Sequence, residues 1–320
     1  MKKKVTNVSA SVRALLLNLA KRQGRPYNEI LQYYVIERFL YRLSRSSYSE
    51  LFVLKGALML QLWGPSLARA TKDVDLLGKV AHSVESTLDI MRECLRLTVP
   101  DDGLRFDANS IEGSEIRIQE KYRGARVRFR AFIGSARLQL QVDVGFGDRV
   151  VPEPQVLTYP TLLDSAKPLL LGYTPESMIA EKVHTMAVRE MANTRLKDFY
   201  DIWILALRRE FDGEILSEAI RTTFSQRGTE LSAEPPLALS AAFFGNPVKQ
   251  SQWQAFLRKA RLVDDLPPIH EIFLVLRDFL VPPISAAAVG RSLRLEWPAG
   301  GPWRSAKDHQ SAALPTPAES

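Results

Sequence analysis

Alternation of apolar and polar residues divides the chain into a mixed first half and a helical second half. Apolar residues recur at helical spacing in residues 11–22, 27–45 and 83–97, which predicts three helices with one apolar side each. Apolar residues alternate with polar ones in residues 125–133 and 138–148. This predicts β-strands, because successive side chains of a strand point to opposite faces. The first half therefore combines helices with antiparallel β-structure.

The second half carries mainly helical patterns. Thr174 and Pro175 predict a helix start, since threonine caps a helix and proline fits its first turn. From Pro282 onward the chain is rich in Ala, Gly, Pro and Ser, which is typical of disorder. Further helices are expected over residues 176–192, 195–205, 215–224, 251–261 and 269–279.

These patterns predict an α+β fold, in which a mixed sheet is flanked by helices and followed by a helical C-terminal lobe. With 320 residues, 46% of them hydrophobic, the chain is long enough for two ordinary domains with a substantial core. We expect an N-terminal domain with its leading helices over residues 1–150, the helical lobe over 151–285, and a disordered tail over 286–320.

The composition indicates where such a protein works. A single cysteine, Cys94, excludes an internal disulfide framework and fits a reducing compartment. The basic start of the chain is not followed by the apolar run of a signal peptide. No stretch of the sequence reaches the roughly 18 apolar residues of a membrane span. We therefore expect a cytoplasmic protein without membrane contact.

The net charge is +7 and the pI about 9.5. A basic surplus favours polyanionic partners such as nucleic acid, although many soluble proteins are mildly basic without such a partner. Arg38, Arg42 and Arg45 are expected on the outer side of the second helix. There they either contact a phosphate backbone or are simply solvated.

Three aspartates stand out in the predicted strands. Asp73 and Asp75 are two residues apart in an apolar run, so they project to the same side of a strand. Asp143 lies near the end of another predicted strand, just before Gly145 and Gly147, and aspartate is depleted in strands. Carboxylates held side by side repel one another unless a cation lies between them, and Mg²⁺ prefers oxygen ligands. The pattern predicts a site for Mg²⁺ or Mn²⁺, although a surface Asp-x-Asp beside a turn is common.

A second charged group lies on the predicted helices of the second half. Lys182 could neutralise a triphosphate, whereas most lysines are only solvated. Asp198 and Asp201 share one helix face. They orient Lys182, accept a proton, or form surface salt bridges with Arg195 and Lys197. The sequence contains no zinc pattern, P-loop or Gly-x-Ser-x-Gly elbow.

In their order along the chain, these and other motifs resemble the AbiEii/AbiGii toxin family. Its members are nucleotidyltransferases of the DNA polymerase β superfamily and toxins of bacterial type IV toxin–antitoxin pairs. The resemblance implies a nucleotidyltransferase-like sheet with flanking helices, then a helical lobe. It covers about residue 8 to about residue 280 and rests on Ser11-Val12-Arg13-Ala14-Leu15-Leu16, residues 37–44, residues 52–57, Arg69-x-Thr71-Lys72-Asp73-Val74-Asp75, residues 143–148, Glu181-Lys182 and Arg195-x-Lys197-Asp198-x-x-Asp201.

The resemblance also implies roles for individual residues. The metal ligands would be Asp73, Asp75 and Asp143, with Lys182 and Asp198 completing the catalytic set and Asp201 as the weaker candidate. The superfamily usually has Gly-Ser or Gly-Gly where this chain has Gly56-Ala57, so Thr71 is expected to supply the missing hydroxyl. The implied nucleotide-binding residues are Lys55, Gly56, Ala57, Thr71, Lys72 and Lys182.

The implied activity is Mg²⁺-dependent transfer of a nucleotide from a nucleoside triphosphate (NTP) to RNA, at the 3′ end of tRNA. Such a change would block aminoacylation and stop translation, and a cognate antitoxin would be the protein partner. Two alternatives stay open from the residues alone. One is a metal-dependent nuclease, because paired acids and a lysine also suit phosphodiester hydrolysis. The other is a non-catalytic RNA- or protein-binding module on the same fold.

Overall fold

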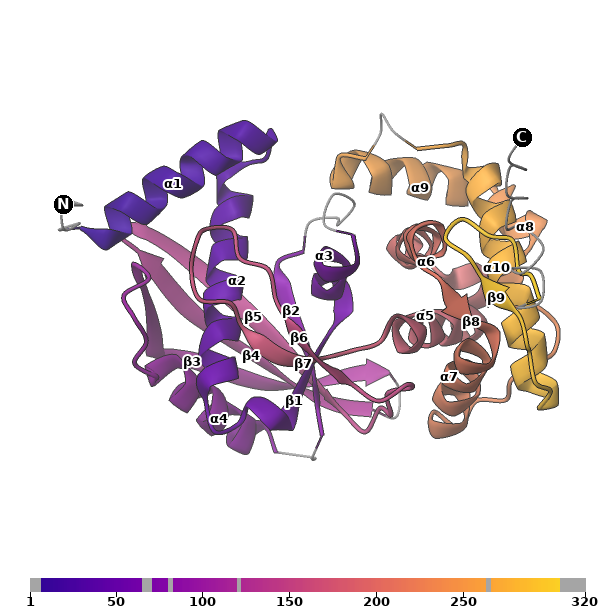
Figure 1. Cartoon of the computed structure of the whole chain (residues 1–320), viewed down its shortest axis with the longest axis horizontal. Coiled ribbons are helices and arrows are strands. Elements are labelled where there is room, and N and C mark those ends of the chain that lie inside the picture. The colour runs from indigo at the N-terminus through magenta and orange to yellow at the C-terminus, as the bar shows by residue number, and fades with distance from the viewer. Residues whose placement is uncertain (1–6, 65–70, 80–82, 120–121, 263–265, 306–320) are drawn as a thin grey trace, which may run out of the picture. The chain divides into compact units, whose positions relative to one another are not determined.

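The computed structural model describes residues 7–64, 71–79, 83–119, 122–262 and 266–305. The chain divides into two compact units (Figure 1). The first comprises Met1–Asp148 and Pro154–Tyr173, and the second comprises Arg149–Glu153 and Thr174–Ser320. Each unit is described by itself below.

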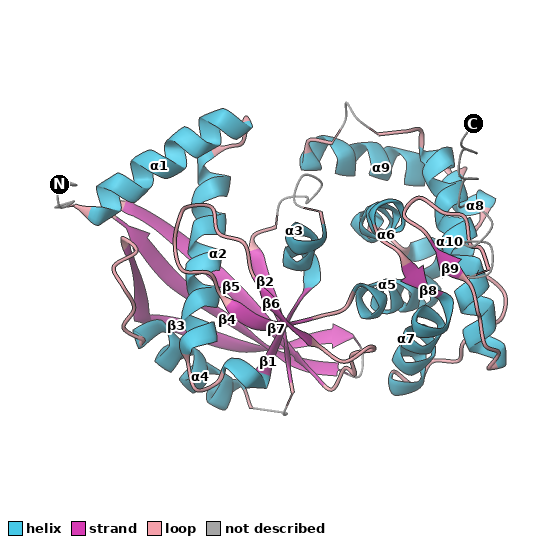
Figure 2. Ribbon diagram, viewed as in Figure 1, coloured by secondary structure: helices cyan, strands magenta, loops and turns pink. Residues whose placement is uncertain are grey.

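A seven-stranded mixed sheet organises the first unit (Figure 2). Its strand order is β3-β4-β5-β2-β1-β7-β6, and the predicted α+β class is confirmed. The last two strands extend the sheet, although both lie beyond residue 150, where the sequence suggested a boundary. The strands are β1 Phe52–Lys55, β2 Asp73–Gly78, β3 Leu104–Gln119, β4 Tyr122–Ile133, β5 Ala136–Phe146, β6 Gln155–Thr158 and β7 Leu169–Gly172. The helices are α1 Val8–Gln23, α2 Tyr27–Arg45, α3 Leu60–Trp63 and α4 Val84–Arg96.

The core of this unit lies on one face of the sheet. Helix α2 contacts β5, and α4 contacts β3 and β4. Phe39 of α2 lies 5.4 Å from Phe129 of β4, ring centre to ring centre. On β5, Leu140, Val142 and Val144 are fully buried. The residues between them point to the other face, which leaves that face of β4 and β5 polar.

Two arginines of α2 do not form the outer basic face that the sequence suggested. Arg38 and Arg42 are buried, and only Arg45 of the three is exposed. Arg42 donates from Nη1 to Asp102 Oδ2 over 2.7 Å, and Arg38 donates from Nε to the same oxygen over 3.2 Å. The expectation was wrong because α2 is covered on nearly all sides, and Asp102 is buried and needs a counter-charge.

Glu37 of α2 is a buried acid in the same region. Its Oε2 accepts a hydrogen bond from the Leu162 backbone N–H over 2.7 Å, and Oε1 has no hydrogen-bond partner among the described residues. Burial raises the pKa of Glu37 to about 8, despite the opposing effects of that hydrogen bond and of Arg38. The carboxyl is therefore protonated at neutral pH in the folded protein.

The second unit is mainly helical, as predicted, with one short strand pair (Figure 2). Residues 286–305 are not the disordered tail that the composition suggested. Trp297 is buried, and its ring lies 4.9 Å from Phe279 and 5.5 Å from Trp303, so aromatic packing orders this segment. The rest of that expected tail, 306–320, lies outside the described residues. The elements are α5 Pro175–Arg189, α6 Leu196–Arg208, β8 Phe211–Asp212, α7 Gly213–Gln226, α8 Ala241–Phe244, α9 Pro247–Ala260, α10 Ile269–Val289 and β9 Glu296–Trp297.

Helix α10 is longer than its sequence pattern suggested. It continues through Pro282 and Pro283 to Val289, and within the described residues it alone is long and apolar enough to cross a membrane. The sequence pattern predicted this helix only to residue 279 and no stretch of about 18 apolar residues; the longer helix, interrupted by Arg277 and Asp278, passes by length and mean hydropathy. Half of the apolar window is buried inside the protein, as in a core helix.

Replacing Glu37 by glutamine tests its protonation. The folded-state pKa is raised from 4.5 to about 8. The stability that Glu37 contributes is therefore fully present below the unfolded-state pKa and is lost as pH rises through 8, at up to about 1.4 kcal/mol per pH unit. In E37Q this slope should disappear, because glutamine is neutral throughout. Urea unfolding of both proteins at pH 6 and pH 9 measures the difference; parallel losses in both would contradict the assignment.

Candidate active site

The sheet brings Asp75 and Asp143 side by side. Strands β2 and β5 are parallel neighbours, and their register pairs Asp75 with Asp143 and Asp73 with Gln141. Residues directly opposite each other share a face of the sheet, so all three aspartates lie on the polar face. The sequence patterns predicted this face for each strand separately. The pairing of β2 with β5 is what brings the aspartates of the two strands close together.

The aspartate pair belongs to a row of charged residues across four strands. Lys55 of β1 is paired with Asp75, Asp75 with Asp143, and Asp143 with Arg126 of β4. The order is cation, acid, acid, cation on one face. Opposite charges on neighbouring strands attract, and they offset the repulsion between the two central carboxylates.

Gly56 makes room for the carboxylate of Asp75. Its φ is +73°, a region that side-chain-bearing residues rarely adopt. A Cβ built on Gly56 would also overlap Asp75 Oδ2. Both observations require glycine here. The predicted nucleotide-binding turn therefore directly abuts a predicted metal ligand.

Lys55, just before that turn, is fixed by two contacts. Its Nζ donates to Asp148 Oδ2 over 3.0 Å and lies 5.1 Å from the centre of the Tyr173 ring. Both partners of this salt bridge are nearly buried. Asp148 was not among the predicted site residues, although it follows the glycine-rich end of β5.

Of the other predicted nucleotide-binding residues of this unit, Thr71 and Lys72 directly precede Asp73 in the chain, and Ala57 follows Gly56. The Thr71 backbone N–H donates to Tyr33 Oη over 3.1 Å, and the Lys72 carbonyl accepts from Gln32 Nε2 over 3.2 Å. Lys72 is exposed, whereas Ala57 is buried. These contacts anchor the backbone that leads into β2.

Arg126 is the site residue that the sequence reasoning missed. Its Nε donates to Asp143 Oδ1 over 2.8 Å and its Nη2 donates to Oδ2 over 2.7 Å. Hydrogen bonding to Asp143, with the nearby charges of Asp73 and Asp75, raises the pKa of Arg126. The available signal was its alternating position on β4, but only the strand register identifies its partner.

The acids match Mg²⁺ in chemistry, and their carboxylate oxygens are its preferred ligands. As the side chains stand, no group of three acid, histidine or cysteine residues in the described ranges is arranged to hold a metal ion. Both oxygens of Asp143 instead accept hydrogen bonds from Arg126. The role of these acids as metal ligands stays a prediction, and a divalent ion would compete with Arg126 for Asp143.

A second charged cluster is buried in the helical unit. Lys182 of α5 donates to Asp198 Oδ1 and to Asp201 Oδ2 of α6, each over 2.8 Å. Arg195 donates from Nε to Asp198 Oδ2 over 2.6 Å. Both acids are fully buried and Lys182 is nearly so. Lys182 is thus not the solvated lysine of the alternative interpretation, and both candidate acids hold it equally.

Asp198 is ionised within this cluster. Burial alone would raise its pKa, but Lys182 and Arg195 together hold the pKa well below its usual range. The stability that this group contributes is therefore present above the ordinary aspartate pKa and is lost only in acid. Lys182 and Asp198 belong to the second unit and the three acids of the sheet to the first. Their joint action stays a prediction.

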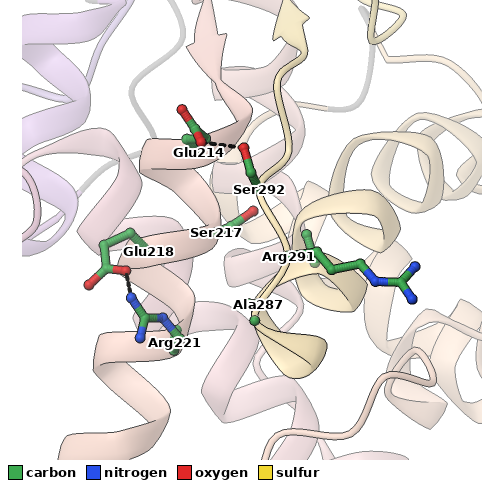
Figure 3. A pocket seen from close by; sticks show the side chains of 9 residues that line it. Glu214, Ser217, Glu218, Arg221, Ala287, Arg291 and Ser292 are labelled. Carbon is green, nitrogen blue, oxygen red and sulfur yellow. Dashed lines mark hydrogen bonds and ion pairs between the residues drawn. The ribbon is translucent and has the colours of Figure 1, made fainter.

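A cavity of about 340 Å³ in the second unit is lined by none of the predicted residues (Figure 3). Within it, Ser292 donates to Glu214 and Arg221 pairs with Glu218. Arg221 and Glu218 thus offset each other's charge in this cavity.

Comparison with known proteins identifies the class. A family model described as "Nucleotidyl transferase AbiEii toxin, Type IV TA system" matches residues 38–275. The chain belongs to this family of toxin nucleotidyltransferases, and the resemblance noted in the sequence is confirmed.

Two solved structures from Helicobacter pylori are similar in fold. JHP933 shares 15% identity with a TM-score of 0.47, over 83% of this chain and 94% of that one. A second protein, provisionally assigned as a nucleotidyltransferase, shares 16% identity with a TM-score of 0.48, over 83% of this chain and 96% of that one. No curated protein matches the sequence.

Removing the charge of Lys182 tests how its cluster is held together. K182M leaves Asp198 and Asp201 buried with Arg195 as the main counter-charge, and losing one partner of a buried ion pair costs about 3–5 kcal/mol. K197M, on the exposed side of α6, should change stability by less than about 0.5 kcal/mol. Urea unfolding followed by tryptophan fluorescence measures both, since four of the five tryptophans lie in the second unit. Equal effects would contradict the buried cluster.

Proposed function

We propose that this toxin nucleotidyltransferase transfers a nucleoside monophosphate from an NTP to the 3′ end of tRNA, in a reaction that requires Mg²⁺ or Mn²⁺. The observation that carries the proposal is the register of β2 and β5, which places Asp75 directly opposite Asp143 with Asp73 on the same face. A cytoplasmic location and a cognate antitoxin complete the proposal, and the family match supports both.

Asp73, Asp75 and Asp143 would hold the divalent ion. When bound, such an ion neutralises phosphate charge and makes the attacking hydroxyl more acidic. The 3′-oxygen forms a bond to the α-phosphorus, and pyrophosphate leaves with the electrons of the bond that breaks. The chain's own contribution is to bind and orient the triphosphate, through Lys55, Gly56, Ala57, Thr71 and Lys72.

The two clusters suit different roles. Asp198 is fully buried, and its two oxygens accept from Lys182 and Arg195, which makes it a poor proton acceptor. Both oxygens of Asp143 are held as well, by Arg126, but Asp143 retains solvent contact beside Asp75, so it is the better candidate to assist the hydroxyl. Lys182 would attract the triphosphate, and Asp198 and Asp201 would orient it.

Replacing Asp73 or Asp75 by asparagine tests the proposal. Incubation of the full chain with each α-labelled NTP and total tRNA, with and without Mg²⁺, should show metal-dependent labelling of tRNA. D73N and D75N should reduce labelling by about 100-fold or more, because even the loss of a residue that only hydrogen-bonds to a metal ligand costs 10–100-fold. Both should also relieve growth arrest on expression.

D89N is the matched control, since Asp89 is an exposed acid of α4 paired with Arg92. It should label tRNA like the unmodified protein. Cleavage of RNA without incorporation would favour the nuclease instead. Absence of Mg²⁺-dependent NTP binding in calorimetry would favour the non-catalytic module, and full labelling by D75N would remove the proposed site.

A further inference from the structure

The positive charge of Arg126 lies next to the acids, as the charge of a bound cation would. Its guanidinium makes two parallel hydrogen bonds to Asp143, at 2.8 and 2.7 Å, the geometry that makes arginine–carboxylate pairs strong and directional. The charges of Asp73 and Asp75 also act on it. A single arginine thus offsets the acids that the proposed function assigns to a divalent ion.

The Arg126–Asp143 pair is exposed enough to solvent for Asp143 to exchange its partner. Arg126 and Asp143 keep 32% and 16% of their side-chain surface exposed, unlike the buried Lys182 cluster. Water and ions reach such a pair, so breaking it does not leave a fully buried charge. Both Asp143 oxygens accept a hydrogen bond from Arg126, so the intact pair competes with a metal ion for this carboxylate.

Arg128 shows that the contact is specific to one arginine. It lies two residues further along β4 on the same face of the sheet. Its Nε donates to the neutral Gln141 Oε1 over 3.0 Å. A third arginine on this face, Arg130, pairs with Asp107, so of the three only Arg126 directly contacts a predicted metal ligand.

We propose that Arg126 is a resident counter-cation, which holds Asp143 while the site lacks a divalent ion and competes with the ion for that carboxylate. The inference rests on the proposed function, because it takes Asp73, Asp75 and Asp143 as the metal ligands. Arg126 is then a positioning residue. It keeps the acids together in the metal-free protein, and it lowers metal affinity by competition for Asp143. Once released, its guanidinium lies beside the site as a charge for an anionic substrate.

Metal affinity without substrate gives the direct test. Mn²⁺ alone is titrated into the full chain and followed by electron paramagnetic resonance. R126Q removes both the competition for Asp143 and the repulsion between two cations, so its Kd for Mn²⁺ should fall on the order of 10-fold. The melting temperature of R126Q in chelator should also fall below that of the unmodified protein, and Mn²⁺ should raise it by a larger step.

R128Q is the matched control, since it removes the same charge from the same face of the same strand. Its Kd for Mn²⁺ should stay within about twofold of the unmodified protein, because Arg128 reaches Asp143 only through Gln141, whose Nε2 makes a longer contact of 3.4 Å to Asp143 Oδ2. If R126Q does not fold, R126K serves instead. Lysine keeps the charge but lacks the two-pronged contact, so an intermediate tightening is expected.

The outcomes separate this inference from the proposed function. Mn²⁺ binding by the unmodified protein that D75N weakens, but that R126Q and R126K leave unchanged, would overturn the counter-cation role and keep the metal site. Equal tightening in R126Q and R128Q would overturn it as well, because general charge would then explain the effect. Binding that D75N does not weaken, or no binding at all, would overturn the proposed site and this inference with it.

Discussion

The parallel pairing of β2 with β5 is the constraint on which the site depends. Its register places Asp75 opposite Asp143, and the buried residues on the other face fix that register: Val74, Leu76, Val142 and Val144. A slip by one residue would turn one strand's acids into the core and its valines into solvent. The hydrophobic core therefore sets the position of the chemistry, and the acids cannot be moved without losing apolar burial.

Holding acids together requires cations, and the two units meet this requirement differently. In the sheet, Asp75 and Asp143 are flanked by Lys55, which is nearly buried, and by Arg126, which keeps contact with water. In the helical unit, Asp198 and Asp201 enclose Lys182 in a buried network. A partly exposed pair can exchange its partner for an ion, whereas a buried pair is strongly destabilised by losing one member. The sheet cluster therefore suits ion binding and the helical cluster suits rigid positioning.

Local patterns in the sequence were sufficient to predict part of the fold and the family. The alternation in residues 138–148 predicted both β5 and the face on which Asp143 lies, because the pattern depends on neighbouring residues alone. The motifs also identified the family, which the match over residues 38–275 confirms. The catalytic, metal-binding and nucleotide-binding roles of individual residues stay predictions.

What the sequence did not reveal depends on contacts between distant segments. Arg38 and Arg42 were predicted on the outer face of the second helix. The helical pattern contains no information on Asp102, which is distant in the chain and packs against both arginines. Arg126 could be matched to Asp143 only through strand register. The end of α10 was missed because proline usually stops a helix. Trp297 orders a segment whose composition alone suggests disorder.

The central claim is that the β2–β5 pairing creates a divalent-metal site. Crystals grown with Mn²⁺ and a non-hydrolysable NTP, measured for anomalous scattering at the manganese edge, test it most directly. The account predicts an anomalous peak within coordination distance of Asp75 and Asp143 carboxylate oxygens. Manganese bound elsewhere, with these two carboxylates free of it, would contradict the account.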